Sequence, residues 1–121
     1  MRKAIFALVA LAVACNSPTG PVQITSRNGA LQLTNATDGP VFYTIIESET
    51  AARVDWAPCV NPSVCPYIAP HQQRAIPYAE ITGYHPGARE AIVYWWHLEA
   101  PADAYQPDSI RATRVRLAPG A

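Results

Sequence analysis

Lysine, methionine and clustered positive charge are scarce in this chain of 121 residues. Its only lysine is Lys3 and its only methionine is Met1. Without a basic patch or run, the chain has no surface suited to a nucleic-acid phosphate backbone, so we expect no nucleic acid among its partners. Without an internal methionine, a blue-copper site with an axial methionine is excluded.

The chain also lacks the short motifs that mark common enzymes and metal sites. It contains no HExxH, GxSxG, P-loop or GxGxxG pattern. Its three histidines, His71, His85 and His97, are 14 and 12 residues apart. Glu47 and Glu49 share one face of a predicted strand, where solvated carboxylates are common. We therefore predict no enzymatic activity, no cofactor and no bound metal.

One long apolar run is present, near the start of the chain. Arg2 and Lys3 precede eleven uninterrupted apolar residues, 4–14. As a helix this run would be about 16 Å long, whereas a membrane span needs about 30 Å of apolar length. The pattern predicts a secretory signal peptide over residues 1–14. No other stretch is long and apolar enough to span a membrane.

A cysteine stands directly after this run. The sequence Leu11-Ala12-Val13-Ala14 before Cys15 resembles the lipobox of bacterial lipoproteins, in which a small residue precedes an obligatory cysteine. The resemblance implies that Cys15 becomes the first mature residue and carries the lipid that anchors the protein in a membrane. The alternative is ordinary cleavage after Ala12-Val13-Ala14, which also fits the A-x-A rule and would release a soluble periplasmic protein.

Residues 15–21 then form a short lipidated tether. Asn16 is not the aspartate that retains many lipoproteins in the inner membrane of Gram-negative cells, so the resemblance favours an outer-membrane location, facing the periplasm or the cell surface.

Removal of Arg2 and Lys3 leaves 9 − 2 = 7 basic residues against 9 acidic ones. The mature side chains then carry a net charge of −2.

The two remaining cysteines are Cys59 and Cys65, in the segment CVNPSVC. An even pair of cysteines in an exported protein predicts a disulfide. Asn61 and Pro62 suit a tight turn between them. The alternatives are a metal or redox site, but metal ligands need closer cysteines with further partners, and redox pairs have the C-x-x-C spacing.

Short strand patterns recur along the rest of the chain, separated by turns. Asn28-Gly29 predicts a two-residue hairpin turn. Further turns are expected at 37–40 and 84–88. Pro77 indicates that its strand lies at a sheet edge or contains a bulge. Residues 47–53 suit one helical turn, and 100–109 form a proline-rich loop. The expected strands are 22–26, 30–35, 41–48, 53–57, 72–79, 89–98 and 110–117.

About seven short strands over residues 22–117 predict an all-β domain, an antiparallel β-sandwich, followed by a tail at 118–121. This organisation resembles that of immunoglobulin-like and fibronectin type III-like domains. The cysteines that bridge the two sheets of antibody domains are missing, because Cys59 and Cys65 are too close in sequence. With its lipobox, the whole chain resembles the small lipoproteins of bacteria that have an outer membrane.

The strand REAIVYWWHL, 89–98, is apolar on both faces. Alternation places Ile92, Tyr94, Trp96 and Leu98 on one face and Ala91, Val93, Trp95 and His97 on the other. The first set is larger and more continuous, so we assign it to the core. Trp95 and His97 then point away from the core. They either form a binding patch for a protein or glycan, or are covered by the Cys59–Cys65 loop or the 100–109 loop.

A second candidate surface is the disulfide-pinned loop 55–70, which Trp56 and Tyr67 flank. A preorganised loop binds with less loss of conformational entropy. Taken together, the sequence favours a non-catalytic envelope lipoprotein that binds or assembles with an envelope protein or glycan. The alternatives are an accessory subunit of an envelope complex without a ligand of its own, a protease inhibitor, or a secreted enzyme.

Overall fold

The computed structural model describes residues 19–100 and 104–118. The predicted signal peptide, Cys15, the first part of the tether and the last residues of the tail lie outside these ranges. Within the described ranges, no helix is long and apolar enough to cross a membrane.

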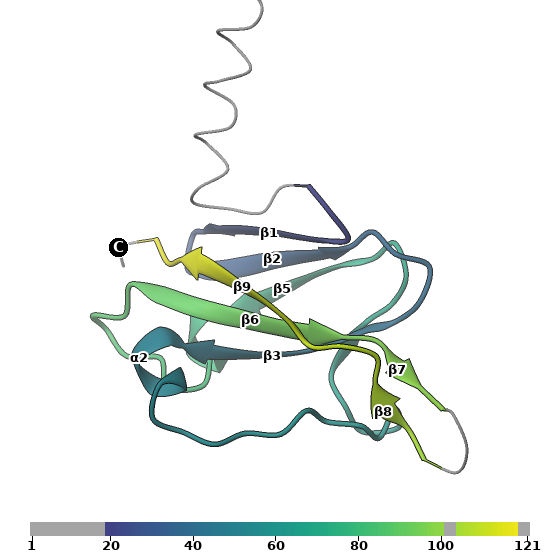
Figure 1. Ribbon diagram of the computed structural model, residues 1–121. Coiled ribbons are helices and arrows are strands. Elements are labelled where there is room, and N and C mark those ends of the chain that lie inside the picture. The colour runs from purple at the N-terminus through teal and green to yellow at the C-terminus, as the bar shows by residue number, and fades with distance from the viewer. Residues whose placement is uncertain (1–18, 101–103, 119–121) are drawn as a thin grey trace, which may run out of the picture.

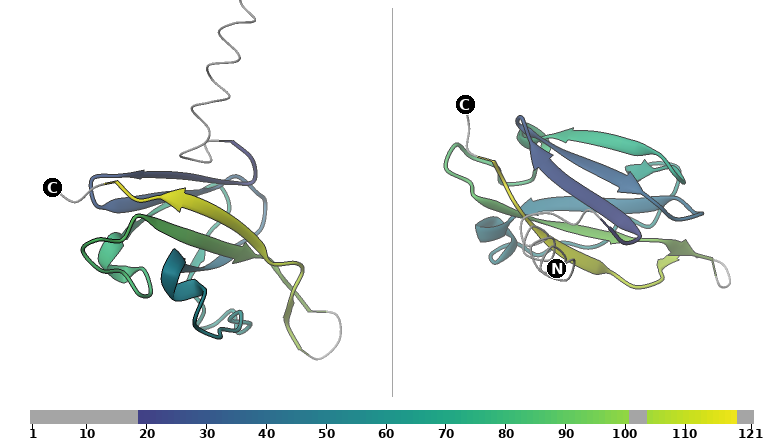
Figure 2. Two further views of the ribbon diagram at one scale, coloured as in Figure 1. Left: turned by 60° about the vertical axis from the view of Figure 1, so that its left-hand side comes forward. Right: turned by 90° about the horizontal axis from the view of Figure 1, so that it is seen from above.

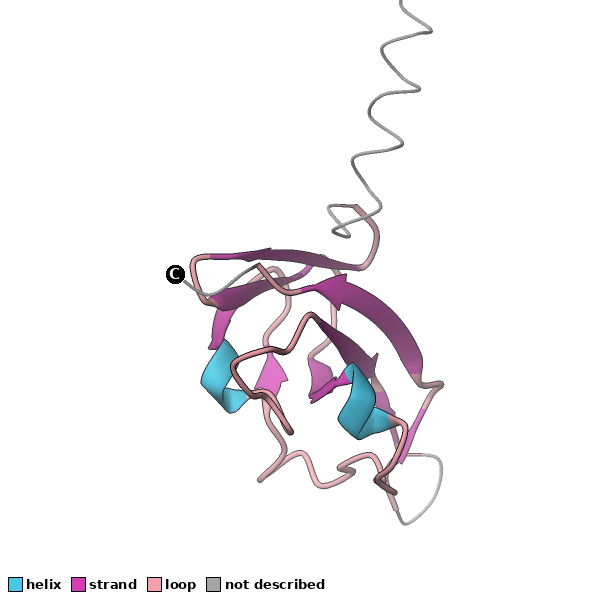
Figure 3. Cartoon of the chain, turned by 90° about the vertical axis from the view of Figure 1, so that its left-hand side faces the viewer, coloured by secondary structure: helices cyan, strands magenta, loops and turns pink. Residues whose placement is uncertain are grey.

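The described chain is built mainly of antiparallel strands, which confirms the predicted all-β class (Figure 1). A three-stranded sheet has the order β1 (Val22–Arg27), β2 (Ala30–Asn35), β5 (Gln73–Pro77). A four-stranded sheet has the order β4 (Tyr67–Ile68), β3 (Val41–Glu47), β6 (Glu90–Trp96), β9 (Arg111–Arg116). The short strands β7 (Leu98–Glu99) and β8 (Gln106–Pro107) pair with each other, and the helical segments are α2 (Ser48–Ala51) and η2 (Tyr78–Glu80) (Figure 3).

The first hairpin shows how sequence sets register. Asn28 and Gly29 have φ angles of 56° and 77°. Two successive positive φ angles define a type I′ turn, whose twist matches that of the strands it joins. The turn aligns Arg27 with Ala30 and, at the far end of the hairpin, Val22 with Asn35. The Asn-Gly pair therefore fixes which residues of β1 and β2 face the same side, as predicted.

The two main sheets lie as separate layers, with one core between their facing sides (Figure 2). Alternate residues of each strand contribute to this core, as expected for strands with one buried face. The three-stranded sheet supplies Val22, Ile24, Leu31, Leu33 and Ile76, and the four-stranded sheet supplies Val41, Tyr43, Ile45, Ile68, Ala91, Val93, Trp95 and Val115.

A second, smaller core lies on the opposite face of the four-stranded sheet. It consists of Phe42, Trp96 and Cys65, with Trp56, Cys59, Tyr94 and Leu98 packed against them. The loop after α2 runs along this face (Figure 1). It brings the Trp56 ring within 4.5 Å of the Tyr94 ring and 6.1 Å of the Trp96 ring, between centroids. As a result, β3 and β6 are buried on both faces.

The predicted orientation of β6 is wrong. Trp95, expected to point outward, lies between the sheets with 5% of its surface exposed. Trp96, assigned to the inter-sheet core, lies instead under the disulfide loop, and its indole N–H donates to the Cys59 carbonyl at 3.1 Å. Alternation correctly separated the two faces, but the larger apolar set packs against a loop rather than against the second sheet.

The disulfide between Cys59 and Cys65 is present, as predicted, with 5.7 Å between the Cα atoms. Asn61 organises the turn inside it. The Asn61 carbonyl accepts from the backbone N–H groups of Val64 and Cys65, and its side chain accepts from Ser63 N–H. Because the loop is fixed at its base, it forms a stable cover for Trp96.

Other predicted elements differ in detail. Residues 53–57 form no strand, because this segment crosses the outer face of the sheet and packs there through Trp56. The predicted helical turn at 47–53 is α2, which Glu47 caps through hydrogen bonds from the backbone N–H groups of Glu49 and Thr50. The loop 100–109 contains β8, which pairs with β7. Pro77 ends β5, an edge strand, as expected.

Replacing Trp95 tests which face of β6 is internal. Because Trp95 fills the space between the sheets, Trp95→Ala should lower the free energy of unfolding by about 3–5 kcal/mol. Val64 is 71% exposed, so the control Val64→Ala should change it by less than about 0.5 kcal/mol. Urea denaturation followed by circular dichroism measures both. Equal stability of the two variants would contradict the assignment of Trp95 to the core.

Candidate functional site

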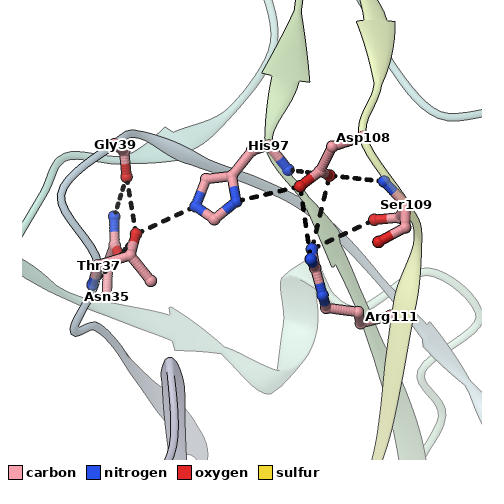
Figure 4. A network of polar contacts seen from close by, with 7 residues as sticks. All are labelled: Asn35, Thr37, Gly39, His97, Asp108, Ser109 and Arg111. Atoms are coloured by element: carbon pink, nitrogen blue, oxygen red, sulfur yellow. Dashed lines mark hydrogen bonds and ion pairs between the residues drawn. The ribbon is translucent and has the colours of Figure 1, made fainter.

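His97 follows β6 and links two segments that are distant in sequence (Figure 4). Its Nε2 lies 3.0 Å from the Thr37 hydroxyl, in the turn between β2 and β3. Its Nδ1 lies 3.5 Å from Asp108 Oδ2, in the segment before β9. The His97 backbone N–H also donates to Asp108 Oδ1 at 3.0 Å. The side chain is 27% exposed, so His97 is a partly buried connection rather than part of an exposed patch.

Asn35 fixes the position of Thr37. Its Nδ2 donates to the carbonyls of Gly39 and Ile68, at 2.8 and 2.9 Å. Since carbonyl oxygens can only accept, this sets the orientation of the amide, and Oδ1 must be the atom that accepts from Thr37. It accepts from both the backbone N–H and the hydroxyl of Thr37, at 2.8 and 2.7 Å. Asn35 is fully buried, so the turn is tied to the core.

The contacts Thr37–His97–Asp108 occur in the order of a nucleophile, base and acid. Unlike the hydroxyl of such a triad, the Thr37 hydroxyl has two further acceptors beside the imidazole. Asn35 Oδ1 lies 2.7 Å and the Gly39 carbonyl 3.1 Å from this hydroxyl, and the tautomer of the His97 ring sets which atom donates in the contact between Thr37 and Nε2. These contacts tie the three residues into one structural connection.

Asp108 is the anionic end of this network. Burial by itself would raise the pKa of its carboxyl group, but hydrogen bonds from the backbone N–H groups of Ser109 and His97, together with Arg111, lower the pKa below its ordinary value. Arg111 in turn places its guanidinium 4.5 Å from the centroid of the Trp95 ring. The network therefore joins the surface beside His97 to the inter-sheet core.

A recess of about 460 Å³ opens beside His97. Three segments form its walls: the turn between β2 and β3, the disulfide loop, and the chain around β7 and β8. Its lining residues are Thr37, Asp38, Gly39, Pro40, Phe42, Pro62, His97, Leu98 and Tyr105. This volume lies within the range of sites that hold small ligands or single large side chains.

Each wall of the recess is fixed by contacts described above. Asn35 holds the turn, the disulfide holds Pro62, and the bond between His97 and Asp108 holds the end of the β7–β8 segment. Asp108 N–H also donates to the His97 carbonyl at 2.9 Å. Because the walls are fixed, the recess exists without a ligand, which reduces the entropy lost when one binds.

The residues of the two predicted binding surfaces, Trp95 with His97 and Trp56 with Tyr67, are not brought together in one exposed patch. Trp95 is in the inter-sheet core and Trp56 is packed on Trp96. Tyr67 is 47% exposed and lies 6.0 Å from Phe42, between ring centroids. His97 is the one member of that set that lines the recess.

Sequence reasoning missed Thr37, Asp38 and Tyr105 as site residues, together with the supporting pair Asn35 and Asp108. The segment TDGP was recognised as a turn, but nothing in its sequence says what lies opposite it. One signal in the sequence could have indicated this turn, namely the spacing of Asn35 and Thr37. An asparagine side chain often accepts a hydrogen bond from the backbone N–H two residues ahead.

Glu47, Glu49 and His85 form a second cluster, each with one potential ligand atom within 4.8 Å of the others. The Glu47 carboxylate is already engaged. It is 3% exposed and accepts from Glu49 N–H, Thr50 N–H and the Thr50 hydroxyl. Burial opposes its ionisation, but these hydrogen bonds and nearby His85 outweigh it and lower its pKa. Because the helix cap explains this carboxylate, we assign no metal to the cluster.

Comparison of the chain with protein-family models, with curated proteins and with solved structures finds no match. The chemistry of the recess is therefore what indicates a function. That recess combines a largely apolar lining with one fully exposed carboxylate, Asp38, and with polar groups on Thr37 and His97 that already bond to each other.

The lowered pKa of Asp108 predicts a specific dependence of stability on pH. Its folded pKa lies below the ordinary value of 3.8, so between the two values the unfolded chain binds more protons. The stabilisation is therefore complete above the unfolded pKa and is lost as pH falls through the folded pKa. In Asp108→Asn the free energy of unfolding should fall less steeply with acid below about pH 5.

Denaturant unfolding at a series of pH values from neutral to strongly acidic measures this difference. Asp55→Asn, which removes an exposed carboxylate outside the network, serves as the control and should retain the wild-type slope. If Asp108→Asn and wild type lost stability in parallel as the pH fell, the assigned role of Asp108 would be wrong.

Proposed function

We propose that this protein is a non-catalytic binding module of a bacterial cell envelope. In this proposal residues 1–14 direct export, Cys15 carries the lipid anchor, and the tether 15–21 joins it to an immunoglobulin-like β-sandwich. The protein is held in the outer membrane, facing the periplasm or the surface. It uses no cofactor or nucleic acid and binds or assembles with another component of the envelope.

The single observation that carries the binding function is the preformed recess beside His97. Its three walls are fixed separately, by Asn35, by the disulfide and by Asp108. Phe42 and Leu98 contribute apolar surface to it, while Tyr105 stands at the recess with 49% of its surface exposed. Aromatic side chains with one exposed side commonly contribute strongly to binding.

The hydrogen bonds within the site favour binding over catalysis. The Thr37 hydroxyl lies within hydrogen-bond distance of Asn35 Oδ1 and the Gly39 carbonyl, and both ring nitrogens of His97 face partners within the protein. These groups are used to hold the walls of the recess in place. A site of this kind presents a defined shape to a ligand.

Lipidation at Cys15 is directly testable. Mass spectrometry of the mature protein should find an N-terminal Cys15 that carries acyl chains, and the protein should fractionate with membranes. Cys15→Ala should abolish both properties, since at least two acyl chains are needed for stable anchoring, while the control Asn16→Ala should retain them. Membrane fractionation of Cys15→Ala would contradict the lipobox assignment.

Binding at the recess is testable by photo-crosslinking in the native cell. The photoreactive residue p-benzoylphenylalanine in place of Tyr105 should give one discrete crosslinked product on irradiation. The same residue in place of Arg53 is the control, because Arg53 follows α2 at the other end of the molecule from β7 and β8 (Figure 1). Equal or no crosslinking at the two positions would contradict a binding role for the recess and favour an accessory subunit without its own ligand.

A further inference from the structure

The charge at the recess restricts what can bind there. Among the described residues that line it, Asp38 is the one acid, and no lysine or arginine is present. The Asp38 side chain is fully exposed. Its carboxylate has one partner, His71, whose Nε2 lies 2.9 Å away and whose own side chain is 63% exposed. A carboxylate in this setting attracts a cationic group of a ligand.

The remaining lining is mostly apolar or aromatic, from Pro40, Phe42, Pro62, Leu98 and Tyr105. The polar groups of Thr37 and His97 are already engaged within the protein. The recess thus offers space for one apolar side chain and one nearby site for a positive charge. It does not offer the several free hydrogen-bonding groups that a hydroxyl-rich glycan requires.

From this combination we propose that the recess binds a cationic peptide segment of a partner protein. An aromatic or aliphatic side chain of the segment occupies the recess, and a neighbouring lysine or arginine pairs with Asp38. This inference rests on the binding function proposed above and names its ligand. A lipid surface is a poorer occupant, since the anionic headgroups of a membrane would repel Asp38.

The position of the recess adds a constraint on the partner. Ala36 N–H donates to the Pro21 carbonyl at 2.8 Å, so the turn that carries Thr37 and Asp38 lies beside the point at which the tether enters the domain. Seven tether residues, even when fully extended, span at most about 25 Å. With Cys15 anchored in lipid, the partner's segment must therefore lie close to the membrane surface.

The test uses the full lipidated protein in nanodiscs of zwitterionic phosphatidylcholine, with empty nanodiscs as the blank. The probes are four blocked tripeptides: Arg-Trp-Arg, Ser-Trp-Ser, Glu-Trp-Glu and Arg-Gly-Arg. Saturation-transfer NMR titrations measure their dissociation constants. Arg-Trp-Arg should bind most tightly, and Ser-Trp-Ser less tightly because it lacks the cation. Glu-Trp-Glu and Arg-Gly-Arg should bind most weakly, because Asp38 repels the first and the second has no side chain to fill the recess.

Two variants separate charge from apolar contact. Asp38→Asn should weaken Arg-Trp-Arg about two- to fivefold, the range expected for an exposed ion pair, and leave Ser-Trp-Ser unchanged. Asp55→Asn makes the same change in charge at an exposed position outside the recess lining and should have no effect. Tyr105→Ala should weaken Arg-Trp-Arg and Ser-Trp-Ser alike.

Equal binding of Arg-Trp-Arg and Glu-Trp-Glu would overturn the proposed ligand class, as would equal effects of Asp38→Asn and Asp55→Asn. The outcome is distinguishable from failure of the binding function itself. If no tripeptide binds but crosslinking at position 105 gives a discrete product, the recess is a binding site for another ligand. If both experiments fail, the binding function fails as well.

Discussion

The two-sided burial of β3 and β6 is the constraint on which the rest of this structure depends. These strands pair with each other over six residues, from Phe42 opposite Trp96 to Glu47 opposite Ala91. One face of the pair packs against the three-stranded sheet and the other needs a second cover. A loop supplies that cover, through Trp56 and the disulfide, because leaving Phe42 and Trp96 in water would forfeit the free energy of burying two large aromatic side chains.

The recess is a consequence of this arrangement. The disulfide loop that covers Trp96 also places Pro62 near the end of β6, where the chain continues through His97 into β7. The turn after β2 arrives at the same end, because it leads into β3, whose Phe42 pairs with Trp96 at the end of β6. His97 then bonds to the turn on one side and to Asp108 on the other, and these bonds separate the walls by a fixed distance.

The same bonds engage the polar side chains of the site within the protein. Thr37, His97 and Asp108 contact one another in the order of a catalytic triad, but the Thr37 hydroxyl also lies within hydrogen-bond distance of the Asn35 side chain and the Gly39 carbonyl. The buried amide of Asn35 directs both of its N–H donors at carbonyls, which turns its Oδ1 toward Thr37. Polar groups satisfied within the protein stabilise the site's shape, and its chemistry is then set by the groups left exposed, chiefly Asp38 and Tyr105.

Local patterns in the sequence were enough to determine the all-β class, six of the strands, the hairpin turn at Asn28-Gly29 and the disulfide. These depend on residues close together in the chain: alternation along a strand, positive φ in a turn, and two cysteines six positions apart. Tertiary structure alone decided which face of β6 meets the second sheet and what His97 touches. Alternation defines two faces but does not say what covers each one, and the contact between Thr37 and His97 spans 60 residues. That contact exists because the register of four strands and the path of a loop bring both side chains to one end of the domain.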